Sequence, residues 1–95
     1  MAIQSFGNAV AEKVAGRQRV ASLHPDVQKV AQRKLALLEF AKTLDDLRVP
    51  PGNRLEKLRG DREGQHSIRI NDQWRLCFRW TPKGPAEVEL VDYHR

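Results

Sequence analysis

Apolar positions in the first half of the chain recur with a helical period. Over 25–42 they are spaced three and four residues apart and form one stripe (Val27, Val30, Ala31, Leu35 and Leu38). Pro25 suits the first helical position, because a proline there gives up no helical hydrogen bond. A shorter helix is expected over 9–15, ended by Gly16.

Two other segments of this half carry local signals. Residues 2–6 are expected to form a short strand, with Ile3 and Phe6 partly buried. Thr43 is followed three residues later by Asp46, which is the pattern of a capping box. A short helical turn is therefore expected after Thr43, and the prolines at 50–51 should stop it.

The second half changes to alternation, which predicts strands over 54–59, 67–70, 74–80 and 86–91. The segments 60–64, 71–72 and 81–85 read as turns or loops between them. The clearest alternation puts four large apolar residues on one face (Trp74, Leu76, Phe78 and Trp80) and Arg75, Cys77 and Arg79 on the other. These amphipathic strands need one covered face, so we expect an α+β fold with the helices packed on an antiparallel meander of about four strands.

Length and cysteine content narrow the class of protein. The chain has 95 residues, which predicts a single domain over 1–95. The lone Cys77 excludes an internal disulfide framework and a cysteine-rich zinc site. No apolar stretch is long enough to span a membrane, and the first residues lack the pattern of a secretory signal, so a cytoplasmic location is expected.

Positive charge is concentrated in one third of the chain. The formal net charge is +5, and the segment 48–79 holds eight basic residues against four acids. Arginine dominates, and its planar fork of donors matches a phosphate. Charge alone leaves two interpretations open, a polyanion-binding surface and a solvated face.

The residues that could carry chemistry lie at the end of the chain. The three histidines have no metal-ligand spacing, and no phosphate-binding glycine loop or nucleophile elbow is present. Asp92, Tyr93 and His94 can each move protons. RNA supplies its own nucleophile, the 2′-hydroxyl, so cleavage needs only a base, an acid and cations for the developing charge. The alternative is an inert, frayed terminus.

Each basic residue also has a purely structural interpretation. Arg59 and Arg62 could form surface ion pairs beside a turn, and Arg69 and Arg79 could pair with Glu87 or Glu89 across strands. Arg75 is harder to explain in this way, because it lies in mid-strand between two large apolar residues. Trp74 and Trp80 are in phase with the core face, Tyr93 could stack on a base or cap the core, and His24 suits a helix N-cap.

Three segments together resemble the HigB branch of the RelE/ParE toxin superfamily. They are 44–62, 64–75 and 91–94, more than a third of the chain, and the predicted order of elements agrees over the remainder. The resemblance implies a RelE-type fold, with helices on a curved antiparallel sheet. It also implies metal-independent cleavage of mRNA on the translating ribosome. The implied partner is a HigA helix-turn-helix antitoxin, and the complex of the two would bind operator DNA.

Carried over residue by residue, the resemblance gives a catalytic set of Asp92, Tyr93, His94, Arg75 and Arg59. The family often has lysine where this chain has Arg59, and arginine can only stabilise charge because it stays protonated. Five further basic residues are expected to bind RNA phosphates, namely Arg54, Lys57, Arg62, Arg69 and Arg79. No metal and no cofactor are expected, and no membrane partner.

Two other functions remain open from the sequence. ParE-like relatives share the fold but poison DNA gyrase, and on that reading the Asp-Tyr-His ending is only a tail. The other open function is that of a toxin with little nuclease activity, which mainly forms a repressor complex with its antitoxin.

Overall fold

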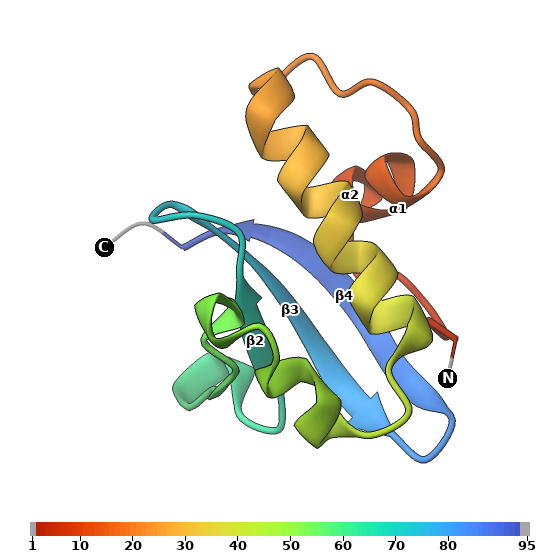
Figure 1. The fold of residues 1–95 in the computed structure, drawn as a ribbon, viewed down its shortest axis with the longest axis vertical. Coiled ribbons are helices and arrows are strands. Elements are labelled where there is room, and N and C mark those ends of the chain that lie inside the picture. Colours follow the sequence, from red (N-terminus) through yellow and green to blue (C-terminus); the bar gives the residue numbers. More distant parts are fainter. Residues whose placement is uncertain (1, 94–95) are drawn as a thin grey trace.

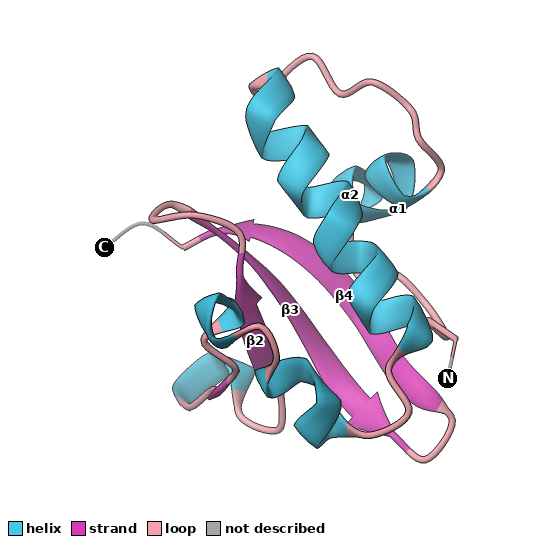
Figure 2. Ribbon diagram, in the orientation of Figure 1, coloured by secondary structure: helices cyan, strands magenta, loops and turns pink. Residues whose placement is uncertain are grey.

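A computed structural model describes residues 2–93, and it consists of two helices and a four-stranded antiparallel sheet (Figure 1). The helices are α1 (Ala9–Ala15) and α2 (Pro25–Phe40); the strands are β1 (Glu56–Lys57), β2 (His66–Arg69), β3 (Trp74–Thr81) and β4 (Gly84–Asp92). Short 3-10 turns η1 (Leu44–Arg48), η2 (Pro51–Asn53) and η3 (Gly60–Arg62) lie between α2 and β2. The strands follow the order β1-β2-β3-β4, so the predicted α+β meander is confirmed (Figure 2).

The long helix α2 begins as predicted and ends two residues early. His24 is its N-cap, and its Nδ1 accepts a hydrogen bond from the Asp26 backbone N–H at 3.1 Å. The C-cap residue Ala41 has an extended backbone, so the helix does not reach residue 42. The reason is the expected capping box. The Asp46 carboxylate accepts from the backbone N–H groups of Lys42 and Thr43, which turns the chain into η1.

The predicted strand over 2–6 is wrong, although the burial of Ile3 and Phe6 is right. This segment runs beside β4 with a few backbone hydrogen bonds, but it forms an isolated parallel bridge between Phe6 and Val88 instead of a strand. The chain leaves the sheet at Asn8, whose side chain caps α1 and also bonds the backbone of Leu90 in β4.

The strand boundaries also differ from expectation at two places. β1 covers two residues rather than six, because Arg54 takes a left-handed conformation (φ 47°) that breaks an extended run. The expected loop over 81–85 is only a two-residue connection, since Gly84 and Pro85 already belong to β4. Glu87, also at positive φ (53°), marks an irregularity where the β3–β4 register shifts between Cys77 and Arg79.

The two faces of β3 separate as the alternation predicted. Leu76 and Phe78 are fully buried under the helices, and Trp74 and Trp80 pack against the same core. Helix α2 lies across this face and contacts β3 and β4 (Figure 1). The opposite face carries Arg75, Cys77 and Arg79. We call this opposite side of the sheet the arginine face.

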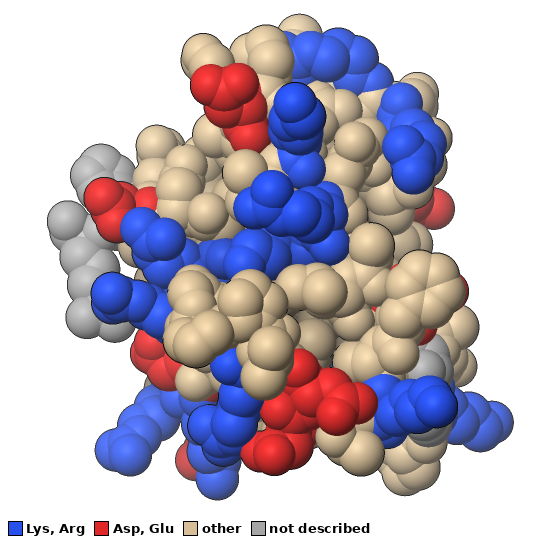
Figure 3. Space-filling model, viewed as in Figure 1, with Lys and Arg blue, Asp and Glu red and all other residues tan. Residues whose placement is uncertain are grey.

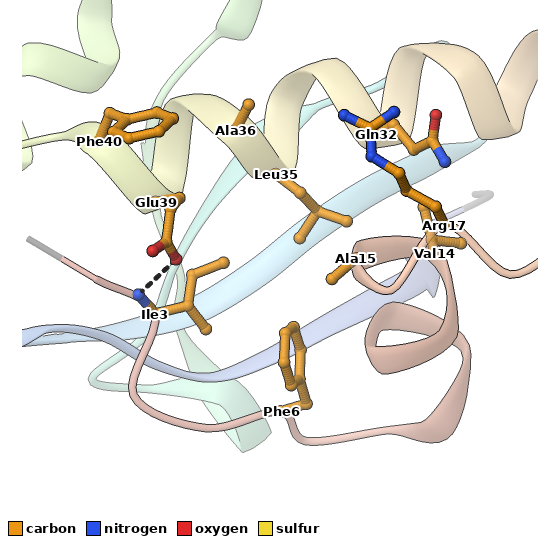
Figure 4. Close-up of a pocket in the computed structure, with 10 residues that line it drawn as sticks. All are labelled: Ile3, Phe6, Val14, Ala15, Arg17, Gln32, Leu35, Ala36, Glu39 and Phe40. Atoms are coloured by element: carbon orange, nitrogen blue, oxygen red, sulfur yellow. Dashed lines mark hydrogen bonds between the residues drawn. The ribbon is translucent and has the colours of Figure 1, made fainter.

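A hollow of about 220 Å³ lies between α1, α2 and the N-terminal segment (Figure 4). Ile3 and Phe6 point into it from the N-terminal segment, and Leu35 does so from α2. The Glu39 carboxylate accepts from the Ile3 backbone N–H at 3.0 Å and fixes that segment. None of the lining residues belongs to the predicted site. Within residues 2–93 no helix is long and apolar enough to cross a membrane.

Candidate functional site

Strand register decides which side chains share the arginine face. Glu56 pairs with Ser67, Ser67 with Cys77, and Cys77 with Glu89, so these four side chains lie in one row across the sheet. Arg69 pairs with Arg75 in the next row on the same face. Acids and a hydroxyl therefore stand beside the predicted arginines, which the charge count alone did not indicate.

Arg75 is the most enclosed arginine of this face, with 15% of its side chain exposed. Its Nη1 donates to the hydroxyl of the buried Ser67 at 2.9 Å and to the Arg54 carbonyl at 3.4 Å. Its Nη2 lies 3.5 Å from a Glu56 carboxylate oxygen. These contacts fix the position of the guanidinium.

The end of β4 lies over this guanidinium. The Arg75 Cζ is 5.6 Å from the centroid of the Tyr93 ring, within the range of a cation–π contact. The Tyr93 backbone N–H donates to the Gln73 carbonyl at 2.6 Å, and the Gln73 side chain donates to Asp92 at 3.1 Å. Arg75 and Tyr93 are thus brought together, whereas Asp92 pairs in register with Trp74, which packs against the core, so Asp92 belongs to the face opposite the arginine face. His94, the remaining member of the predicted tail, lies outside the described residues.

Three other arginines of the predicted set are paired with acids. Arg62 binds Glu89 at 2.6 Å, Arg79 binds Glu87 at 3.2 Å, and Arg69 binds Asp72. The pairing of Arg79 with Glu87 was expected, whereas Arg69 uses its neighbour in the hairpin instead of Glu87 or Glu89. The hydrogen bond that Arg62 donates to the Glu89 carboxylate raises the pKa of Arg62 above its ordinary value. Any anion that binds at these positions must therefore compete with a carboxylate.

The remaining predicted residues lie in different places. Arg59 is exposed just before η3, and no hydrogen bond or ion pair within residues 2–93 joins it to Arg75 or Tyr93. Arg54 is exposed, and what it contributes to the Arg75 cluster is its carbonyl. Lys57 pairs in register with His66, which pairs with the core residue Phe78, so Lys57 belongs to the face opposite the arginine face.

Basic side chains also gather on the helix side of the molecule. Figure 3, viewed from that side, shows Lys and Arg in a band across the middle, with Asp and Glu clustered below it. The exposed Lys29 and Arg33 of α2 belong to this side. The positive surplus is therefore not confined to the arginine face. What distinguishes that face is the enclosed guanidinium of Arg75.

Three residues that contact Arg75 or the tail escaped sequence reasoning: Glu56, Ser67 and Gln73. Each acts on Arg75 or on the tail through a contact that spans 8 to 20 residues of sequence, so no local pattern marks it. Cys77 beside them is fully buried, and burial raises the pKa of its thiol. This fits its predicted role as a small residue of the sheet.

His66 gives the fold a pH dependence. Its ring stacks on Phe78, with centroids 6.4 Å apart, and its Nδ1 is buried without a hydrogen-bond partner among the described residues. Burial, then the charges of Lys57 and Arg48, lower its pKa below 6.5. The unfolded chain then binds more protons than the folded chain as the pH falls below neutrality.

We therefore expect wild-type stability to decrease as the pH falls through 6.5 and the folded-state pKa of His66. Replacing His66 by glutamine should flatten this decrease, because glutamine takes up no proton. Thermal midpoints of both proteins between about pH 5 and pH 7.5 measure the effect. Parallel curves for the two proteins would contradict the assignment.

Comparison with known proteins gives a family and two relatives. Residues 8–94 match the family described as RelE-like toxin of type II toxin-antitoxin system HigB. The chain is 44% identical over 69 residues to Toxin HigB-1 of Vibrio cholerae serotype O1, covering 73% of this chain and 72% of that protein. It is 38% identical over 55 residues to an uncharacterized protein of Haemophilus influenzae strain Rd, covering 58% of this chain and 54% of that one.

Proposed function

The chain belongs to the HigB-like family of RelE-like toxins of type II toxin–antitoxin systems, and from that premise we propose that it is a ribosome-dependent mRNA endoribonuclease. The observation that carries the proposal is the packing of Tyr93 on the guanidinium of Arg75. This contact places Tyr93, the residue that follows β4 and stands between Asp92 and His94 in the sequence, against an enclosed cation. The protein would act in the cytoplasm, where its substrate is translated.

The proposed reaction uses the nucleophile that RNA carries. The 2′-oxygen attacks the adjacent phosphorus while its proton passes to a base, and the bond to the 5′-oxygen breaks as an acid protonates that oxygen. The products are a 2′,3′-cyclic phosphate and a 5′-hydroxyl. Arg75 suits the charge that builds on the phosphate oxygens, because its position is held by Ser67 and Glu56 before substrate arrives.

The remaining roles follow from chemistry and position. Asp92 and His94 would share the two proton transfers, and Tyr93 would stack on a base or assist them. Arg59, exposed and outside any ion pair among residues 2–93, would attract the phosphate chain as a fixed cation. Arg54, Arg62, Arg69 and Arg79 would bind neighbouring phosphates, and Lys57 would do so from the other face of the sheet.

Membership of the family implies an antitoxin partner. We propose that this partner is a HigA-type helix-turn-helix protein, which neutralises the toxin and carries it to operator DNA. The neighbouring reading frame would identify the partner directly, since a helix-turn-helix protein has a recognisable sequence pattern.

The proposal predicts cleavage of mRNA on ribosomes with defined chemical ends. Purified protein added to ribosomes programmed with one mRNA should give fragments ending in 2′,3′-cyclic phosphate and 5′-hydroxyl groups. A double variant, His94→Ala with Arg75→Ala, should leave that mRNA intact, because both a proton donor and the held cation are lost. Primer extension on the recovered mRNA maps the cuts.

Two results would contradict the proposal. Identical cleavage maps for the wild type and the double variant would overturn the site. Intact mRNA together with DNA breaks in cells that express the wild type would favour gyrase poisoning instead. Free mRNA without ribosomes is the control for ribosome dependence, and it should be cut much more slowly because the ribosome aligns the RNA.

A further inference from the structure

We propose that Gln73 is a positioning residue for RNA cleavage, which holds the end of β4 over Arg75. Gln73 is exposed and precedes β3 by one residue. It would touch neither the reacting phosphate nor the departing oxygen. The inference rests on the proposed function, because it assigns Gln73 a part in that same site.

The turn that carries Gln73 is itself fixed. The Asn71 side-chain oxygen accepts from the backbone N–H of Gln73 at 2.9 Å and from that of Trp74 at 2.8 Å. The backbone N–H groups of Ile70 and Asn71 both donate to the Trp74 carbonyl. Side-chain bonds of this kind hold a hairpin turn in one conformation. Gln73 therefore projects from a rigid support and not from a mobile loop.

Gln73 contacts the tail at two successive residues. The last paired residues of β3 and β4 are Trp74 and Asp92, and the 2.6 Å bond from the Tyr93 N–H to the Gln73 carbonyl extends this ladder by one residue. The Gln73 side-chain amide donates to Asp92 Oδ2 at 3.1 Å. One contact fixes the backbone of the tail and the other fixes a carboxylate.

The bond to the Gln73 carbonyl fixes the backbone at Tyr93, and the bond from the Gln73 amide holds the residue before it. The Tyr93 ring packs on the guanidinium of Arg75. The Ser67 hydroxyl, the Glu56 carboxylate and the Arg54 carbonyl hold that guanidinium in place. Chain ends fray unless something ties them down. Small displacements of catalytic groups are costly, since a shift of about 1 Å can reduce a rate on the order of a hundredfold. Gln73 would thus keep Tyr93 in place over Arg75.

The kinetic test compares substitutions at Gln73 on ribosome-bound mRNA. Gln73→Ala should lower kcat about tenfold with KM nearly unchanged, and Gln73→Glu should lower it further because two carboxylates then repel. Gln73→Lys should stay within about threefold of the wild type, because it restores a donor to Asp92. Gln4→Ala is the matched control: Gln4 is an exposed glutamine that bonds the Lys83 carbonyl at the other end of the strands.

The structural test uses the single tyrosine of the chain. In protein labelled with 3-fluorotyrosine, the fluorine resonance should shift in Gln73→Ala toward the position that it takes in Arg75→Ala. In Gln4→Ala the resonance should stay at its wild-type position. A resonance that does not shift in Gln73→Ala, or a higher KM with kcat unchanged, would overturn the role of Gln73. A wild type that cuts no mRNA overturns the proposed function instead, and the fluorine resonance then decides alone whether Gln73 holds the tail.

Discussion

Replacing Arg75 by alanine should reduce the rate of mRNA cleavage about a hundredfold or more, with a smaller effect on KM. Removing one preorganised donor from a charged transition state typically costs this much. Arg75 is preorganised by three partners, the hydroxyl of Ser67, the carboxylate of Glu56 and the carbonyl of Arg54. Its orientation is thus set before substrate binds, so ordering the side chain costs little free energy when the transition state forms.

Arg75→Lys separates charge from geometry. Lysine keeps the positive charge but presents it as a point, so it cannot bond Ser67, Glu56 and a phosphate in the fixed pattern of a guanidinium. We expect a rate closer to that of alanine than to that of the wild type. Arg33→Ala, an exposed arginine of α2 on the helix side, is the control and should leave the rate unchanged.

Single-turnover cleavage on programmed ribosomes measures the effect, and circular dichroism checks the fold. The alanine variant leaves the Ser67 hydroxyl and the Glu56 carboxylate without the guanidinium, so some loss of stability is expected. The rate must therefore be measured well below the unfolding transition of each variant. A rate within about threefold of the wild type would remove Arg75 from the mechanism.

Local signals in the sequence predicted local structure well. The capping pattern of Thr43 and Asp46, the N-cap at His24 and the core face of β3 are all confirmed. Each depends on residues within a turn of helix or on alternation along one strand. Such short-range chemistry is visible in the sequence because few other segments take part in it.

Long-range partners could not be predicted in the same way. Arg75 was singled out because a cation in mid-strand is unusual, but the sequence does not say that Ser67 and Glu56 surround it, since this depends on the register of three strands. Glu89, the acid that pairs with Arg62, was missed for the same reason. The pair of Arg69 with Asp72 is local, and it was missed because partners across the strands were considered instead. The length of β1 depends on the conformation of one residue, Arg54, which composition does not reveal.

A buried polar cluster behind the site should dominate the stability of the segment that precedes β1. Asn53 is completely buried, and its side-chain amide donates to the carbonyls of Leu47 at 3.0 Å and Val49 at 3.2 Å. Its side-chain oxygen accepts from the ammonium group of Lys34, which is itself 7% exposed. Burial, then the charges of Arg33 and Arg69, lower the pKa of Lys34, so this cation is held at a cost.

Asn53→Leu should therefore destabilise the fold by roughly 3 kcal/mol or more. The change leaves two carbonyls and a buried ammonium without their partner, and breaking a buried charged contact from one side typically costs about 3–5 kcal/mol. Asn53 directly precedes Arg54, whose carbonyl helps to hold Arg75. The Asn53→Leu variant should consequently lose cleavage activity at temperatures where the wild type is still folded.

A second substitution tests the physical reason. Lys34→Met alone should cost only about 1–3 kcal/mol, because it leaves one neutral oxygen unpaired. Added to Asn53→Leu, it should restore stability by about 1 kcal/mol, since no uncompensated cation then remains in the interior. Urea unfolding of the wild type and the three variants at one pH closes this cycle. If the losses in free energy of unfolding of the two single variants simply add in the double variant, the ammonium group of Lys34 does not depend on Asn53. The segment before β1 is then held by its apolar contacts.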